Sequence, residues 1–130
     1  MDTLRIATRA ILLSLLGLLS ACQATGPAAV DSILGYLEAT IEGDLEGAVG
    51  LSCAAWEAEA RVEADSFNAV IARLEGVTCS GTEGGGDRQV VSCSGKIVAN
   101  YGEEVLEIDL SKRIFVTAFE DGQWKMCGYQ

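Results

Sequence analysis

The chain has 130 residues, a formal net charge of −10 at pH 7 and no histidine. This acidic balance argues against a protein that binds nucleic acid or lies on an anionic lipid surface. The missing histidine removes the commonest general base and the commonest transition-metal ligand. From the charge we expect no nucleic-acid partner, and we also expect no metal and no cofactor.

Residues 1–21 have the organisation of a secretory signal. Two arginines precede an apolar run over residues 10–19, and the sequence Leu-Ser-Ala-Cys then ends at Cys22. The run has about half of the roughly 20 apolar residues that a membrane-spanning helix needs, and it lacks the spaced polar residues of a cytosolic core helix. The residues before Cys22 also fit the small-x-small site of general signal peptidase poorly. The stretch resembles the cleavage box of bacterial lipoproteins, which implies removal of residues 1–21 and a lipid anchor on Cys22.

The residues after Cys22 indicate how the protein is held at the membrane. Segment 22–29 is small, polar and proline-containing, which predicts a short tether ahead of a single domain, residues 30–130. Acyl chains on Cys22 suffice as an anchor because each buried CH2 contributes about 0.8 kcal/mol. We expect a lipid-anchored, extracytoplasmic protein of the cell envelope. Aspartate after such a cysteine often signals inner-membrane retention, and Gln23 favours the outer membrane if the host is diderm.

The domain is predicted to begin with helices. Apolar residues recur at three- and four-residue steps as far as Gly43, where we expect the first helix to end. Asp44 is the predicted N-cap of a second, shorter helix. The alanine-rich segment 54–74 predicts a further helix, broken near Asp65. The stripe of the first helix consists of Val30, Ile33, Leu34, Leu37 and Ile41.

From Val77 onward the hydrophobic pattern changes to a period of two, which predicts strands. Turn signals at 82–87, 100–103 and 121–122 divide this region into a four-stranded antiparallel meander. The predicted fold class is therefore α+β, with N-terminal helices packed on the sheet.

The turns also predict which strand residues pair. A two-residue turn at 121–122 pairs Phe119 with Trp124, and a turn centred on 101–102 pairs Ile97 with Leu106. If Cys79 faces Cys93 as well, one sheet face is almost wholly apolar and should lie under the helices. That face holds Val77, Cys79, Val91, Cys93, Ile97, Leu106, Ile108, Leu110, Ile114, Val116, Ala118 and Cys127.

An aromatic cluster falls on the opposite, outer face of the last two predicted strands. Its members are Phe115, Phe119, Trp124 and Met126. A contiguous exposed cluster of this kind often marks an interaction site, so we expect a surface for a protein partner or a second copy of the chain. The alternative is that the C-terminal residues or the tether cover it.

Four cysteines remain after Cys22, and an even number in an exported domain predicts two disulfides with three connectivities. A zinc site is disfavoured because no two of them have the close spacing of zinc ligands. The four are Cys53, Cys79, Cys93 and Cys127.

Two segments resemble the NTF2-like fold, also called SnoaL-like or cystatin-like cone. They are the leading helix that ends at Gly43-Asp44 and the final D-G-Q-W-K-M-C-G of residues 121–128. Over residues 30–130 the chain is similar to small bacterial lipoproteins with such domains. This resemblance implies a Cys53–Cys127 disulfide and, by elimination, a Cys79–Cys93 disulfide, which the predicted register permits. It also implies a conical pocket beneath the helices.

Catalytic NTF2-like proteins that resemble ketosteroid isomerases set an aspartate and a tyrosine inside this cone. The predicted inner face here has no ionisable residue, because Tyr36 lies off the apolar stripe and Tyr101 lies in a turn. We also expect the acidic residues of the third helical segment to form a solvated face: Glu57, Glu59, Glu63 and Asp65.

The sequence therefore favours a non-enzymatic, membrane-anchored module that binds a partner or a small apolar ligand. The alternatives are an enzyme that uses the cone pocket and a purely structural envelope protein. An inner-face carboxylate or tyrosine in a solvent-reachable cavity would favour the enzyme.

Overall fold

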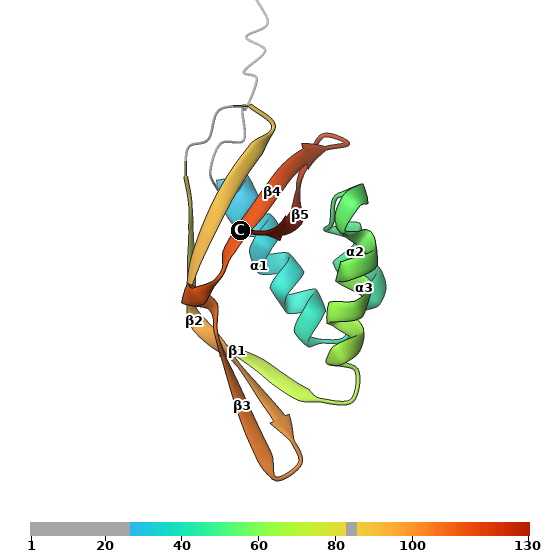
Figure 1. Ribbon diagram of the computed structural model, residues 1–130, viewed down its shortest axis with the longest axis vertical. Coiled ribbons are helices and arrows are strands. Elements are labelled where there is room, and N and C mark those ends of the chain that lie inside the picture. Colours follow the sequence, from blue (N-terminus) through green and yellow to red (C-terminus); the bar gives the residue numbers. More distant parts are fainter. Residues whose placement is uncertain (1–26, 83–85) are drawn as a thin grey trace, which may run out of the picture.

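The structure, a computed structural model, describes residues 27–82 and 86–130 (Figure 1). The expected signal of residues 1–21, the lipidation site Cys22 and tether residues 23–26 lie outside the described residues. Within them, three α-helices come first in the chain and an antiparallel sheet of five strands follows. The α+β class, with the helices packed on the sheet, is confirmed.

Helix α1 spans Pro27–Ile41 and so begins earlier than the expected start at Val30. Proline suits the first turn of a helix because its ring fixes φ and the first backbone N–H groups have no partner within the helix. Gly43, with φ of 68°, follows the end of the helix. A positive φ is readily adopted by glycine, which explains why the chain turns there as the sequence predicts.

Helix α2 spans Leu45–Gly50 and begins as predicted. The Asp44 carboxylate accepts a hydrogen bond of 2.9 Å from the backbone N–H of Gly47, one of the groups that a helix start leaves unpaired. A short 3-10 turn, Ala54–Trp56, then leads into helix α3, Glu57–Ser66.

The predicted helix extension to residue 74 is wrong, because the first strand, β1, spans Ile71–Gly81. Residues 71–74 pair with residues 97–100 of β2, which spans Arg88–Tyr101, and their exposed and half-buried side chains alternate. Strand pairing therefore decides the conformation of a short segment whose local pattern was ambiguous.

The sheet has the order β1-β2-β4-β5, and β3 pairs with β2. Strand β2 is 14 residues long, and it pairs with β4 near its start and with β3 near its end. Figure 1 shows the β2–β3 hairpin extending beyond the helical layer. The strands are β1 Ile71–Gly81, β2 Arg88–Tyr101, β3 Glu104–Asp109, β4 Ile114–Glu120 and β5 Gln123–Tyr129.

Two of the predicted registers are confirmed. Phe119 pairs with Trp124, and Cys79 pairs with Cys93. In the β2–β3 hairpin, Ile97 pairs with Ile108 and not with Leu106. This shift covers an even number of residues, so it leaves the same side chains on each face of the sheet.

The predicted third strand is interrupted by a 3-10 turn, Leu110–Lys112, which separates β3 from β4. The Asp109 carboxylate caps this turn, accepting hydrogen bonds from the backbone N–H of Ser111 at 2.9 Å and from its hydroxyl at 2.6 Å. The turn reverses which side chains face inward. Leu110 is 1% exposed and Phe115 is fully buried, whereas Ile114 is 39% exposed.

This reversal corrects the prediction for the aromatic cluster. Phe115 and Met126 are fully buried, so their placement on an outer face is wrong. The four residues do share a sheet face, but it is the face that the helices cover. Phe119 is 46% exposed, and its ring centroid lies 5.3 Å from that of Trp124. A partner surface at Phe119 and Trp124 stays a prediction.

Both expected disulfides are present. Cys53–Cys127 joins the segment after α2 to β5, and Cys79–Cys93 joins β1 to β2. The first lies beside a short bridge in which the Cys53 N–H donates to the Met126 carbonyl at 2.8 Å. Two disulfides indicate an oxidising, extracytoplasmic location. None of the described helices is long and apolar enough to cross a membrane.

Candidate ligand-binding site

A cavity of about 190 Å³ lies between helices α1 and α3 and the inner face of the sheet. Its walls are largely aliphatic and aromatic, with a few polar groups among them, which is the usual composition of a small-molecule site. The lining residues are Tyr36, Leu37, Thr40, Glu63, Ser66, Phe67, Ile97, Ile108, Leu110, Arg113, Phe115 and Tyr129.

One carboxylate organises the polar part of this cavity. Glu63 Oε2 accepts a hydrogen bond of 2.6 Å from the Tyr36 hydroxyl and one of 3.0 Å from the Tyr129 hydroxyl. The Tyr36 oxygen in turn accepts a bond of 3.2 Å from Trp56 Nε1. These contacts bring together α1, α3, β5 and the 3-10 turn before α3. We call Tyr36, Trp56, Glu63 and Tyr129 the Glu63 cluster.

Helix geometry explains how Tyr36 and Glu63 reach the cavity. Tyr36 is fully buried, one helical turn after the buried Ile33, so the prediction that it lies off the stripe is wrong. Glu63 lies one turn after Ala60, which is also fully buried, and is itself only half-exposed. The prediction of a wholly solvated acidic face is therefore wrong for Glu63, whereas Glu57, Glu59 and Asp65 are exposed as expected.

Aromatic contacts fix Tyr129 near the end of β5. Its ring centroid lies 5.3 Å from that of Phe115 and 5.6 Å from that of Trp56, the latter in an edge-to-face arrangement. The exposed Arg113 guanidinium lies 5.1 Å from the centre of the same ring. Such contacts stabilise a ring in one orientation and hold its hydroxyl toward Glu63.

The surroundings keep both tyrosine hydroxyls protonated. Burial raises the pKa of Tyr36 above the usual tyrosine range, and the hydrogen bond to the Glu63 carboxylate and its charge raise it further. Burial and then the charge of Glu63 likewise raise the pKa of Tyr129, with a smaller opposing effect from Arg113. At neutral pH each hydroxyl therefore keeps its hydrogen, and each donates a hydrogen bond to Glu63.

Thr40 adds an unpaired group to the cavity wall. Its side chain is buried, and its Oγ1 has no hydrogen-bond partner among the described residues. An unpaired buried hydroxyl costs about 1 to 3 kcal/mol. A ligand or an ordered water at this atom would remove that cost.

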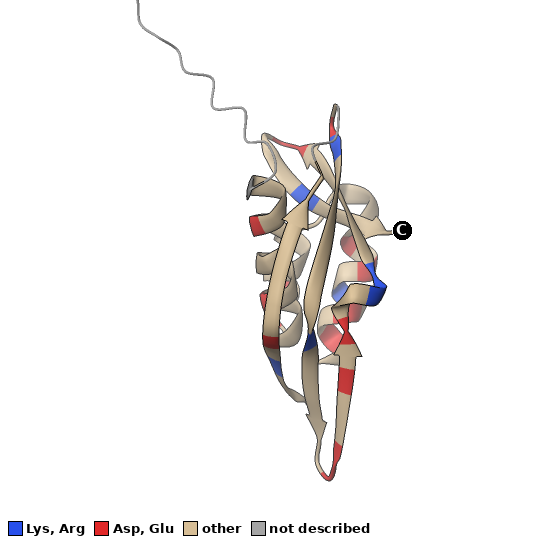
Figure 2. Cartoon of the chain, turned by 90° about the vertical axis from the view of Figure 1, so that its left-hand side faces the viewer, with Lys and Arg blue, Asp and Glu red and all other residues tan. Residues whose placement is uncertain are grey.

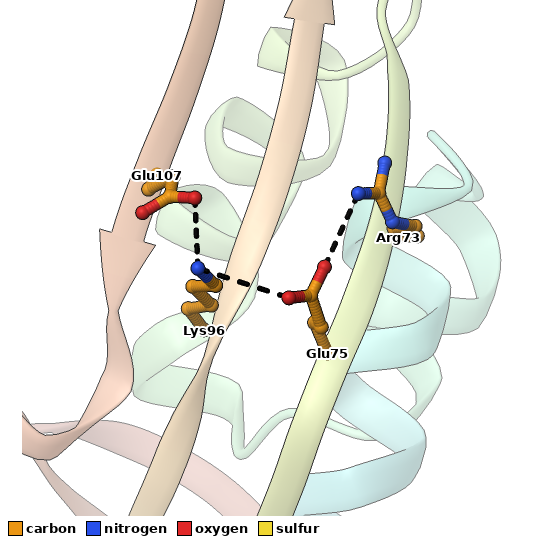
Figure 3. A network of polar contacts seen from close by, with 4 residues as sticks. All are labelled: Arg73, Glu75, Lys96 and Glu107. Carbon is orange, nitrogen blue, oxygen red and sulfur yellow. Dashed lines mark hydrogen bonds and ion pairs between the residues drawn. The ribbon is translucent and has the colours of Figure 1, made fainter.

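A second polar cluster lies on the outer face of the sheet and is fully used within the protein. Lys96 Nζ lies 2.7 Å from Glu107 and 3.7 Å from Glu75, which also pairs with Arg73 at 3.1 Å (Figure 3). We call these four residues the Lys96 network. Two cations offset two anions in it, so the network offers no free charge to a ligand. Elsewhere, acidic residues are spread over the helices and the sheet (Figure 2).

The structure separates the residues that the sequence singled out. Phe115 forms part of the cavity wall, and Met126 belongs to the buried core. Phe119 and Trp124 line a different, open groove beside the start of α1, together with Ala28. Sequence reasoning missed Tyr36 and Glu63 as site residues, although each follows a small or apolar buried residue at helical spacing.

Comparison with known proteins does not assign the chain to a family. No protein-family model, no curated protein and no solved structure matches it.

Proposed function

We propose that this chain is a lipid-anchored, extracytoplasmic domain of the NTF2-like cone type that binds a small ligand beneath its helices. The observation that carries the proposal is the Glu63 carboxylate, held by two tyrosine hydroxyls inside a cavity of about 190 Å³. The Thr40 hydroxyl in the same wall, which has no partner within residues 27–82 and 86–130, supports it. The anchor rests on the lipoprotein-like sequence ending at Cys22, and the location is supported by the two disulfides.

The size of the cavity limits the ligand. A protein cavity of about 150 Å³ is large enough to bind benzene, and pockets for drug-sized molecules start at about 300 Å³. A cavity of about 190 Å³ therefore suits a ligand of one ring or a short branched chain with one or two polar groups. Leu37, Ile97 and Phe115 would contact its apolar part.

Ligand-observed NMR with ring-sized fragments and the full chain in detergent tests this proposal. Ile108→Phe should abolish fragment binding, because Ile108 lines the cavity and a larger side chain would fill it. Leu106→Phe is the matched control, since Leu106 lies on the same strand and face but is 49% exposed. The proposal is contradicted if the Ile108→Phe variant still binds the fragments. It is also contradicted if the parent protein binds none of them at millimolar concentration.

An enzyme is the second candidate, and a specific observation favours it. A carboxylate or tyrosine in a solvent-reachable cavity favours an enzyme, and this cavity is lined by Glu63, Tyr36 and Tyr129. Glu63 is placed to act as a general base. However, Tyr36 and Tyr129 both donate to Glu63, so neither is aimed at a developing oxyanion. Simple binding therefore fits this arrangement better than catalysis does. Turnover of a bound fragment by the parent protein, abolished in Glu63→Gln, would instead favour the enzyme.

The membrane anchor has its own test. Only the Cys22 thiol can accept diacylglycerol, so Cys22→Ala should give an uncleaved or soluble product. Metabolic labelling with a fatty-acid analogue measures this, and equal labelling of the variant would exclude the anchor without affecting the ligand site.

A further inference from the structure

Resting on the proposed ligand site, we propose that the cavity selects small organic cations, with the ligand's ammonium group at Glu63. Three features of the cavity point to this class of ligand: which hydrogen-bonding groups remain available, which charge is unbalanced, and which side chains form the walls.

Most hydroxyl groups that line the cavity already donate a hydrogen bond within the protein. Tyr36 and Tyr129 donate to Glu63 Oε2, and the Ser66 hydroxyl donates to the Glu63 backbone carbonyl at 2.6 Å. Among the described residues, no hydrogen bond uses Glu63 Oε1. Thr40 and Arg113 also line the cavity and carry donor hydrogens, but the groups gathered at Glu63 present acceptors. A ligand that pairs with Glu63 therefore has to bring hydrogen-bond donors.

The charge at this end is also unbalanced. Within the described part of the chain, Glu63 has no ion-pair partner at 4.0 Å or less, since the ion pairs involve Arg61, Arg73, Lys96 and Lys125 with other acids. A half-buried carboxylate interacts more strongly with a cation than a fully solvated one does. The net charge of −10 also favours approach of a cationic ligand.

The walls suit a cation as well. Four aromatic residues border the cavity, namely Tyr36, Phe67, Phe115 and Tyr129. Aromatic faces attract ammonium groups, and cages of such rings recognise them in other proteins. Arg113 already uses this attraction at Tyr129, where its guanidinium lies 5.1 Å from the ring centre. Because Arg113 is exposed at the edge of the cavity, its charge opposes a second cation and weakens binding without blocking the site.

Three probes of matched shape and different charge test the inference. They are benzylamine, benzyl alcohol and benzoate, titrated at equal ionic strength into the full chain in detergent. The chain has two tryptophans, so Trp124→Phe leaves Trp56, which is bonded to Tyr36, as the fluorescent reporter. We expect benzylamine to bind about tenfold more tightly than benzyl alcohol, and benzoate to bind most weakly. Calorimetry on the unaltered chain checks the same order.

Variants then locate the preference. Glu63→Gln should bring benzylamine and benzyl alcohol to similar affinity, whereas Glu63→Asp should keep the preference because it keeps the charge. Glu59→Gln is the control, since Glu59 lies on the same helix but is exposed. Arg113→Gln should tighten benzylamine binding by removing the competing charge.

The outcomes separate this inference from the proposed function. Equal binding of benzylamine and benzyl alcohol by the parent protein would overturn the cation preference and leave a neutral ligand site. Tightest binding of benzoate would overturn it in favour of an anion at Arg113. Binding of none of the probes or fragments would overturn the ligand site itself. The order of the probes on the parent protein decides the inference even if Glu63→Gln does not fold.

Discussion

The Glu63 cluster and the Lys96 network are both polar groups between secondary-structure elements, but they differ in burial. In the Glu63 cluster, Tyr36 is fully buried and one carboxylate satisfies two hydroxyls. In the Lys96 network, every side chain is at least 35% exposed. Water can replace each contact in the network, whereas loss of a contact in the cluster leaves a buried group without a partner. We therefore expect substitutions at the Glu63 cluster, on the inner face of the sheet, to change the stability of the protein strongly. Substitutions in the Lys96 network, on the outer face, should change it little.

The largest effect is expected from the cavity wall beside the Glu63 cluster. Phe115→Ala should destabilise the protein by about 3 to 5 kcal/mol, because the ring is fully buried and its loss opens a cavity. Phe119→Ala, at 46% exposure, should cost about 1 kcal/mol. Urea unfolding measures both. Similar values for the two variants would show that β4 does not turn Phe115 inward.

The second effect concerns the carboxylate itself. Glu63→Leu should destabilise the protein by about 2 to 4 kcal/mol, because the buried Tyr36 and the half-buried Tyr129 lose the acceptor that their hydroxyls share. Glu59→Leu, exposed on the same helix, should change the free energy of unfolding by only about 0.5 kcal/mol. Equal costs for both variants would mean that the cluster is not shielded from water.

The third effect is a loss of stability at alkaline pH. The pKa values of Tyr36 and Tyr129 are raised in the folded protein, so only the unfolded chain ionises them near the usual value of about 10. Their contribution is complete below that pH and is lost as the pH rises above it. Urea midpoints between pH 8 and 11 should therefore fall at the alkaline end, and less steeply in Tyr36→Phe. An unchanged slope in that variant would contradict the burial of its hydroxyl.

The smallest effect is expected from the Lys96 network. The hydrogen bond to Glu107 raises the pKa of Lys96, but the ammonium group is exposed and water screens its ion pairs. Lys96→Met should leave the urea midpoint close to that of the parent protein at 0.15 M salt, with any difference shrinking further at 1 M. A clear, salt-independent loss would show that the outer face is not a solvated surface.

The local signals in the sequence proved to be reliable where neighbouring residues decide the structure. The turn at Gly43, the Asp44 cap and the Phe119–Trp124 pairing each depend on a few adjacent residues, and all three are confirmed. The α+β class follows from the change of hydrophobic period, which is also a local property. The two disulfides were implied by resemblance and are present.

Tertiary structure decided which face of β4 lies inside. A turn of only three residues, Leu110–Lys112, separates β3 from β4. The three consecutive polar residues at 111–113 break the alternating pattern there, but no glycine or proline marks a turn. Because side chains alternate along a strand, this interruption moved Phe115 from the predicted outer face into the core.

The candidate site was likewise beyond the sequence alone. Its carboxylate and hydroxyls come from α1, α3 and β5, and a separation of 66 residues lies between Glu63 and Tyr129. The sequence contains acidic and aromatic residues that could form such a site. However, an acidic residue equally fits a solvated surface, and an aromatic residue equally fits a core. Only the packing of α3 against α1 and α2, with the small Ala60 and Ala64 fully buried, brings Glu63 to the two tyrosines. Helix spacing fixes which residues share a face, and tertiary contacts fix what that face meets.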